Sequence, residues 1–212
     1  MKSVIRTANW LAFIVAFAAL AGCSAGPEVK SIKQAPGGMQ PPEHILVLAI
    51  NSKEANRAVM ESALVARLQA SNLKATSYGA AQQMPWEDPQ QLRERIKQRL
   101  QSENADRVLT VSLVRKNRQV EHIPQHAVFN PVTVSYGPLA SATYMETMLV
   151  PDTYKETTEY ILRTTLFDAD SGDSLWQMFS STIDPKSLEE AAKQYAKVVV
   201  RQLNKSFDEG TR

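Results

Sequence analysis

The chain of 212 residues contains one cysteine, Cys23, and little excess charge of either sign. A single cysteine excludes an internal disulfide framework. Lys and Arg number 24 against 22 Asp and Glu, and leaving out Lys2 and Arg6, which lie in a segment that we expect to be cleaved, gives 22 against 22. Because it has no basic run, the chain lacks the electrostatic footprint of a phosphate-backbone binder, and we expect no nucleic-acid partner.

The first apolar run is too short to span a membrane as a helix. It extends from Trp10 to Gly22, or 13 residues, whereas a transmembrane helix needs about 20. The run follows Lys2 and Arg6 and ends at small residues, which is the arrangement of an export signal. We therefore predict that residues 1–22 are a signal peptide.

The end of this run, Leu20-Ala21-Gly22-Cys23, resembles the lipobox of bacterial lipoproteins. The resemblance implies cleavage before Cys23, a diacylglycerol on its thiol and an acyl chain such as palmitate on its new amino group. A plain secreted protein cleaved nearby is the alternative. In Gram-negative lipoproteins an Asp after the cysteine retains many members in the inner membrane, so Ser24 implies anchoring to the outer membrane, on its periplasmic side.

The prolines and glycines of residues 23–43 are typical of a flexible tether. Twenty such residues have a root-mean-square span of about 25 Å and an extended limit of about 70 Å. We expect a single periplasmic domain, 44–212, to follow this tether and to stay close to the membrane.

Hydrophobic periodicity and capping signals predict an α+β domain with the element order β-α-β-α-β, then a β-hairpin, then a final helix. Alternating early strands and helices imply parallel crossovers on one mixed sheet, with helices packed on it and a final hairpin that extends it antiparallel. The expected strands are 44–50, 73–78, 107–114, 154–167 and 174–183, and the expected helices are 54–70, 88–100 and 187–207.

This order, the lipobox and the hairpin residues Asp168, Gly172 and Trp176 resemble a group of small envelope lipoproteins. The group shares its fold with the amino-terminal domain of the Tol-system translocation protein, the curli-secretion lipoprotein and the lipoprotein activators of penicillin-binding proteins. The resemblance covers roughly residues 45–207 by pattern. It implies scaffolding, partner binding or pore assembly rather than catalysis.

Residues that could support catalysis or bind a metal are few. His122 and His126 have the four-residue spacing of a zinc helix, but Pro124 lies between them, and the third histidine, His44, stands far away in sequence. The carboxylates Asp168, Asp170 and Asp173 lack the spacing and closing glutamate of a calcium loop, which favours turn chemistry. We predict no catalytic residue, no metal and no cofactor.

A second unusual segment is the insertion 116–153, which has no Asp, Glu, Lys or Arg between His126 and Met145. Such a segment either covers the core or meets a partner, with covering slightly favoured. Two stretches of 9 and 10 residues within it also approach the length of a tilted membrane-crossing strand, about 9–11 residues. If the segment binds a partner, the candidate contact residues are its aromatic side chains Phe129, Tyr136 and Tyr144.

These observations predict a non-enzymatic outer-membrane lipoprotein that acts as an accessory or scaffold for another envelope protein, with homo-oligomers possible. Two alternatives stay open: a subunit of an outer-membrane pore or secretion assembly that uses the insertion as a membrane hairpin, and a periplasmic hydrolase without a recognisable motif.

Overall fold

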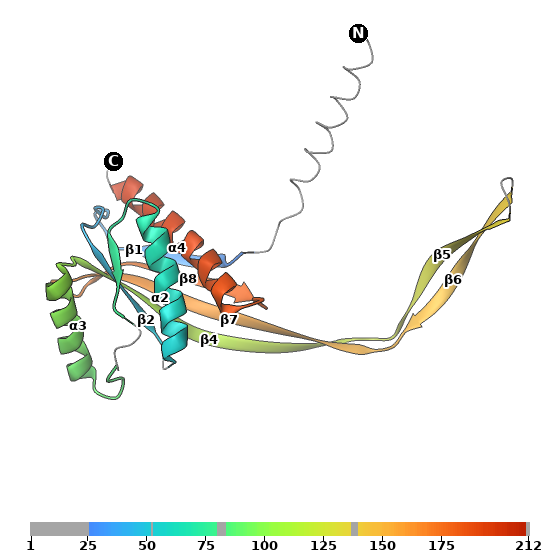
Figure 1. Cartoon of the computed structure of the whole chain (residues 1–212), viewed down its shortest axis with the longest axis horizontal. Coiled ribbons are helices and arrows are strands. Elements are labelled where there is room, and N and C mark those ends of the chain that lie inside the picture. Colours follow the sequence, from blue (N-terminus) through green and yellow to red (C-terminus); the bar gives the residue numbers. More distant parts are fainter. Residues whose placement is uncertain (1–25, 52, 80–83, 137–139, 211–212) are drawn as a thin grey trace, which may run out of the picture.

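The computed structural model describes residues 26–51, 53–79, 84–136 and 140–210. Six strands form a mixed sheet in the order β1-β8-β7-β4-β2-β3, and β5 and β6 form a separate two-stranded sheet (Figure 1). β2 is parallel to β3 and β4, whereas β7 pairs antiparallel with β4 and β8, which confirms the predicted α+β class. The elements are β1 (Glu28–Gln34), β2 (Ile45–Ile50), α2 (Glu54–Gln69), β3 (Ala75–Ser77), α3 (Pro89–Glu103), β4 (Arg107–Ile123), β5 (His126–Tyr136), β6 (Ala140–Val150), β7 (Thr153–Asp168), β8 (Ser174–Ile183) and α4 (Leu188–Gly210).

Helices cover the sheet on both faces, and β2 shows how the sequence produces this arrangement. Its residues Ile45, Val47 and Ala49 belong to the hydrophobic cluster that includes residues of α2 and α4. Leu46 and Leu48 belong to a second cluster, against which residues of α3 pack. Because successive side chains of a strand point to opposite faces, a strand covered on both sides is apolar at every position.

The helix starts follow the predicted capping signals. The side chain of Asp88 accepts hydrogen bonds from the backbone N–H groups of Gln90 and Gln91, both at 3.0 Å, at the start of α3. The hydroxyl of Ser187 accepts one from the N–H of Glu190 at 3.1 Å at the start of α4. These bonds satisfy backbone donors that the helix itself leaves unpaired.

The structure differs from the predicted flexible tether, because β1 lies within it. β1 pairs antiparallel with β8 along its whole length, from Glu28 opposite Ser181 to Gln34 opposite Trp176. Pro27, just before β1, is buried, and so is Met39, at 3% exposure. From Glu28 to Gln34 the chain is therefore an edge strand of the sheet rather than tether.

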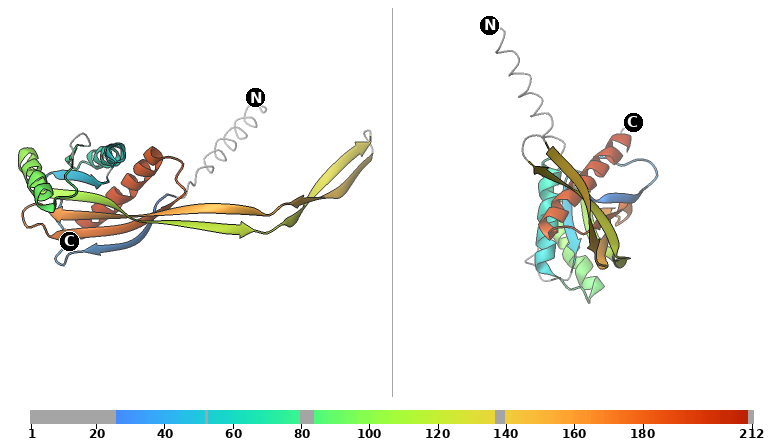
Figure 2. Two further views of the ribbon diagram at one scale, coloured as in Figure 1. Left: turned by 90° about the horizontal axis from the view of Figure 1, so that it is seen from below. Right: turned by 90° about the vertical axis from the view of Figure 1, so that its right-hand side faces the viewer.

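The expectation that the insertion covers the core is wrong. β4 and β7 continue far beyond the rest of the sheet, and the hairpin of β5 and β6 extends them further, away from the helices (Figure 1). The left view of Figure 2 shows the same projection from below. Separately, none of the helices in the described ranges combines the length and the apolarity needed to cross a bilayer.

Candidate partner-binding arm

The feature that distinguishes this domain is a two-stranded ribbon, residues 117–136 and 140–158, which we call the arm. β4 pairs with β2 only as far as Ser112, and β7 pairs with β8 only from Glu159 onward. Beyond these points, in the described part of the chain, the strand ladder joins β4 and β7 only to each other, and Asp184 bonds to Thr158 at the base of the arm. From Asn117 to Tyr136 the ribbon spans about 20 residues, which at about 3.3 Å per residue is about 65 Å of strand.

The inner half of the arm, 117–123 with 152–158, is polar, and non-covalent side-chain contacts join its two strands. Arg118 forms an ion pair with Glu156 at 2.5 Å. His122 lies 3.4 Å from a carboxylate oxygen of Asp152, and its ring centroid lies 4.9 Å from that of Tyr154. Pairs across neighbouring strands are the main stabilising contacts of such a ribbon, because it has no core of its own.

The outer half, β5 with β6, contains Glu146 as its single Asp, Glu, Lys or Arg residue. Phe129, Met145 and Leu149 remain 59%, 57% and 64% exposed. Phe129 lies opposite Thr147, the residue midway between Met145 and Leu149 on β6. Since side chains two positions apart share a face, all three apolar side chains lie on one face of the ribbon. The outer half therefore presents an apolar patch to solvent, which we call the arm patch.

Of the three predicted contact residues, the structure describes the side chain of Phe129 alone. Phe129 is an exposed member of the arm patch. Tyr136 lies opposite Ala140 at the tip, and Tyr144 lies opposite Val132; their side chains are outside the described part of the structure. Cys23 also lies outside the described residues.

Three buried titratable side chains have structural partners. His44 contacts the carbonyl of Glu103 at 2.8 Å and the hydroxyl of Thr76 at 3.1 Å through its two ring nitrogens. The carboxylate of Glu61 accepts the backbone N–H groups of Ala49 and Gly79 at 3.1 and 3.2 Å. Burial raises the pKa of Glu61, and these two bonds partly oppose that shift.

Tyr195 is the third buried group. Its hydroxyl bonds to the hydroxyl of Thr164 on β7, and burial raises the pKa of Tyr195 well above its ordinary value. A phenol in this environment stays protonated, and it joins α4 to the sheet as a hydrogen-bonding group.

The candidate metal residues do not converge. His126 contacts the carbonyl of Pro124 at 3.2 Å, and His122 contacts Asp152 as described. The carboxylate of Asp168 accepts the N–H groups of Asp170 and Ser171 at 3.1 and 2.9 Å, a turn interaction. In the described ranges, no group of three or more His, Cys, Asp or Glu side chains is placed to hold a metal ion.

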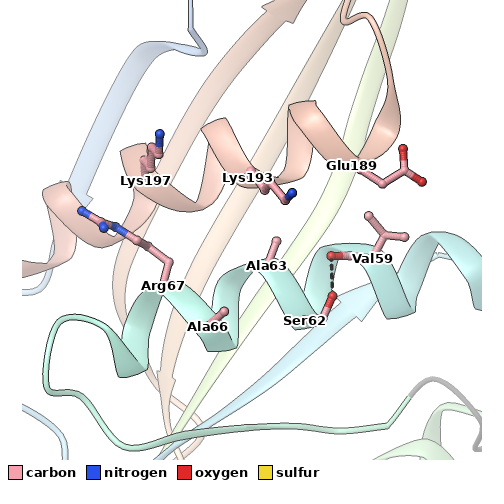
Figure 3. Close-up of a pocket in the computed structure, with 8 residues that line it drawn as sticks. All are labelled: Val59, Ser62, Ala63, Ala66, Arg67, Glu189, Lys193 and Lys197. Atoms are coloured by element: carbon pink, nitrogen blue, oxygen red, sulfur yellow. Dashed lines mark hydrogen bonds between the residues drawn. The ribbon is translucent and has the colours of Figure 1, made fainter.

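A groove of about 600 Å³ lies between α2 and α4, on the side of the helices away from the sheet (Figure 3). Its floor includes Ala63 and Ala66, whose small side chains leave the space open. Lys193 and Lys197 of α4 and Arg67 of α2 line it, with Glu189 at the opposite end from Arg67. This basic groove was not predicted from the sequence.

The groove could have been predicted from the regular spacing of basic residues in α4. Lys193, Lys197, Arg201 and Lys205 recur every four residues, which places them along one side of a helix. The balanced net charge of the chain hides this local concentration.

Comparison with known proteins gives distant structural similarity. No protein-family model matches the sequence, and no curated protein is significantly similar to it. The chain is similar to a PelC dodecamer from Paraburkholderia phytofirmans, with a TM-score of 0.43, 13% identity and coverage of 80% of this chain and 94% of that one. It is also similar to lipoprotein GNA1162 from Neisseria meningitidis, with a TM-score of 0.36, 17% identity and coverage of 78% and 100%.

Proposed function

We propose that this protein is a non-enzymatic lipoprotein of the cell envelope, anchored to the outer membrane through acyl chains on Cys23, whose arm binds another envelope protein. The observation that carries the proposal is the arm patch. It lies far from the domain core, on a ribbon that has no other element of the described chain packed against it. An apolar surface in such a place does not contribute to the core, so a partner is its most direct explanation.

The size of the arm patch suits a specific contact. Covering a large apolar side chain fully is worth about 1.5–3 kcal/mol, and the three side chains of the patch are each more than half exposed. Together they therefore offer about 3–5 kcal/mol. After the cost of association, such a cluster supplies the anchor of a protein interface rather than all of its affinity.

The absence of a catalytic role is also part of the proposal. The buried titratable groups His44, Glu61 and Tyr195 are engaged with backbone groups or with threonine hydroxyls. A hydrolase would need an acid, base or nucleophile that faces a substrate cavity. Wall or lipid hydrolysis by purified protein would contradict this part of the proposal.

A pore or secretion subunit is the second candidate, and the length of the outer half favours it. β5 and β6 have 11 residues each, and a membrane-crossing strand needs about 9–11. In this alternative the outer halves of several copies would pair side by side within a membrane. Glu146 in β6 and Pro131 in β5 count against it, because a charge and a missing backbone donor are both costly there.

In-cell photocrosslinking distinguishes these candidates. A photoreactive amino acid at Thr147, opposite Phe129, should crosslink to a different envelope protein, whereas one at Gln119 in the inner half should not. Crosslinks between copies of this chain, together with ring-sized particles after detergent extraction, would favour the pore subunit. Absence of any crosslink from Thr147 in cells that carry the protein at its native level would refute both.

Localisation needs a separate measurement, because it depends on Ser24 alone. We expect the wild-type protein in outer-membrane fractions and a Ser24→Asp variant in inner-membrane fractions. Wild-type protein in the inner membrane would contradict the sorting proposal and leave the arm proposal untouched.

A further inference from the structure

The basic residues of α4 form a stripe along one side of the helix, between Glu189 and Glu190 in its first turn and Asp208 and Glu209 near its end. Lys193, Lys197, Arg201 and Lys205 are all exposed, and so is Arg67 across the groove. In the part of the chain that the structure describes, no ion pair involves any of these five side chains. Like charges four residues apart on a helix destabilise it by about 0.2–0.5 kcal/mol per pair. This stripe of cations therefore weakens the helix that carries it, which points to a use other than folding.

The chain enters the domain beside this stripe. Because Pro27 is buried and β1 begins at Glu28, the path of the backbone is fixed from there on. A Cβ placed on Gly26 would lie 3.9 Å from the side-chain oxygen of Gln194 in α4. Gln194 precedes Lys197 by three residues and Arg201 by seven, so all three share one side of the helix.

The segment between the lipid anchor and this point is very short. Cys23 and Gly26 are separated by three residue steps, which span at most about 11 Å. The Debye length at physiological ionic strength is about 8 Å. A lipid-modified Cys23 would thus hold the cations nearest to Gln194 within about the range over which charged headgroups act.

We propose that the exposed face of α4, with Arg67 beside it, docks on a bilayer surface that contains anionic phospholipid headgroups. The proposal depends on acylation of Cys23 and goes beyond the binding of a protein by the arm. A cation near an anionic leaflet shifts the docked-to-undocked ratio about fivefold, so the four cations of α4 together give a strong preference. The anchor favours lipid over a diffusing acidic partner, because it keeps the headgroups at a high effective concentration.

Docking through α4 would fix the orientation of the domain. α4 and α2 lie on one face of the sheet, so the sheet would lie behind them, roughly parallel to the membrane (Figures 1 and 2). β4 and β7 would then extend along the membrane plane and present the arm to neighbouring proteins.

The test uses the full-length, lipid-modified protein reconstituted into vesicles. With Cys23 acylated, Ser62→Cys in the groove supplies the only free thiol, and a fluorophore on it reports proximity to lipids that carry a nitroxide on the headgroup. The reference reporter is Gln98→Cys on α3, which packs on the other face of the sheet. We expect several-fold stronger quenching at position 62 than at position 98 in phosphatidylcholine vesicles containing one-third phosphatidylglycerol, and equal quenching in pure phosphatidylcholine.

The charge dependence has a matched control. Lys193→Glu with Lys197→Glu should lower the docked-to-undocked ratio by at least about 25-fold, so that the preferential quenching at position 62 disappears. Arg93→Glu with Lys97→Glu reverses an equally spaced, exposed pair on α3 and should leave the quenching unchanged. Preferential quenching at position 62 that is as strong in neutral vesicles as in anionic ones, or that survives the α4 reversal, would overturn the proposal.

Flotation separates the anchor from the docking. If the protein floats with neither kind of vesicle, it has no lipid anchor. The docking proposal then fails, because it depends on acylation of Cys23. Protein that floats but shows no preferential quenching at position 62 is anchored but not docked, which also refutes the proposal. Neither outcome affects the crosslinks expected from Thr147, so failure of the arm proposal remains distinguishable.

Discussion

Replacing Phe129 by Ala tests whether the arm patch is for binding or for packing. The side chain is 59% exposed, and an enclosed aromatic side chain buries about 150–250 Å², so about 120 Å² is left for a partner to cover. At about 25 cal/mol per Å² this area is worth about 3 kcal/mol. We therefore expect the variant to bind its partner up to about 100-fold more weakly. Its free energy of unfolding should change by less than about 1 kcal/mol, because the domain core makes no use of this residue.

The assay compares crosslinking yield and stability in the same set of variants. The yield from a photoreactive residue at Thr147 should fall in Phe129→Ala and persist in Tyr154→Ala, which removes a 71% exposed aromatic from the inner half of the arm. Phe207→Ala, at a position 4% exposed in the core, should lower the free energy of unfolding by about 3–5 kcal/mol. If Phe129→Ala is destabilised as much as Phe207→Ala while its crosslinks persist, the patch stabilises the fold and the arm proposal is wrong.

Three further outcomes are expected. Cys23→Ala should abolish incorporation of labelled palmitate, and label in that variant would contradict acylation at this residue. Gly210→Ala should lower stability by about 1–3 kcal/mol, because its Cβ would lie 2.4 Å from the backbone nitrogen of Met39; an unchanged melting temperature would contradict this close approach. The N–H of Ser171, with the charge of Arg107, lowers the pKa of Asp168, so the stability this group adds is present above its ordinary pKa and is lost as the pH falls. Asp168→Asn should therefore melt below the wild type at neutral pH, with the difference shrinking towards about pH 3, and a difference that grows on acidification would refute the assignment.

The predictable parts of the fold were those with a local signal. Asp88 and Ser187 predict where α3 and α4 begin, because a helix-capping side chain accepts hydrogen bonds from backbone N–H groups only two or three positions along the chain. The unbroken apolar run from Ile45 to Ala49 predicts a strand covered on both faces for an equally local reason.

β1 could not be recognised in the same way. It is an edge strand that carries Glu28, Lys30 and Lys33, and charges of this kind keep an edge from pairing with other molecules. The same charges, together with nearby prolines, give it the composition of a linker. Its partner β8 is about 150 residues away in sequence, so only the folded domain brings the two together.

The candidate site was predictable in part. The uncharged stretch from His126 to Met145 drew attention to Phe129, and the two strand-length runs within it correspond to β5 and β6. Its projection from the domain was not predictable, because strands that cover a core and strands that leave it share the same alternation. The cations of α4 were visible as a spacing, but their position next to Gly26 depends on β1 and became visible only in three dimensions.

The continuity of β4 and β7 from the sheet into the inner half of the arm has a mechanical consequence. A force applied at the tip pulls these strands along their axes, and the ladders that join β4 to β2 and β7 to β8 cross that direction. Such a load acts in shear on many hydrogen bonds at once, whereas peeling an edge strand breaks them one at a time. β7, β8 and β1 are consecutive neighbours in the sheet, and β1 starts five residues after Cys23. If Cys23 is acylated as proposed, tension at the tip of the arm would therefore pass across three adjacent strands to the membrane.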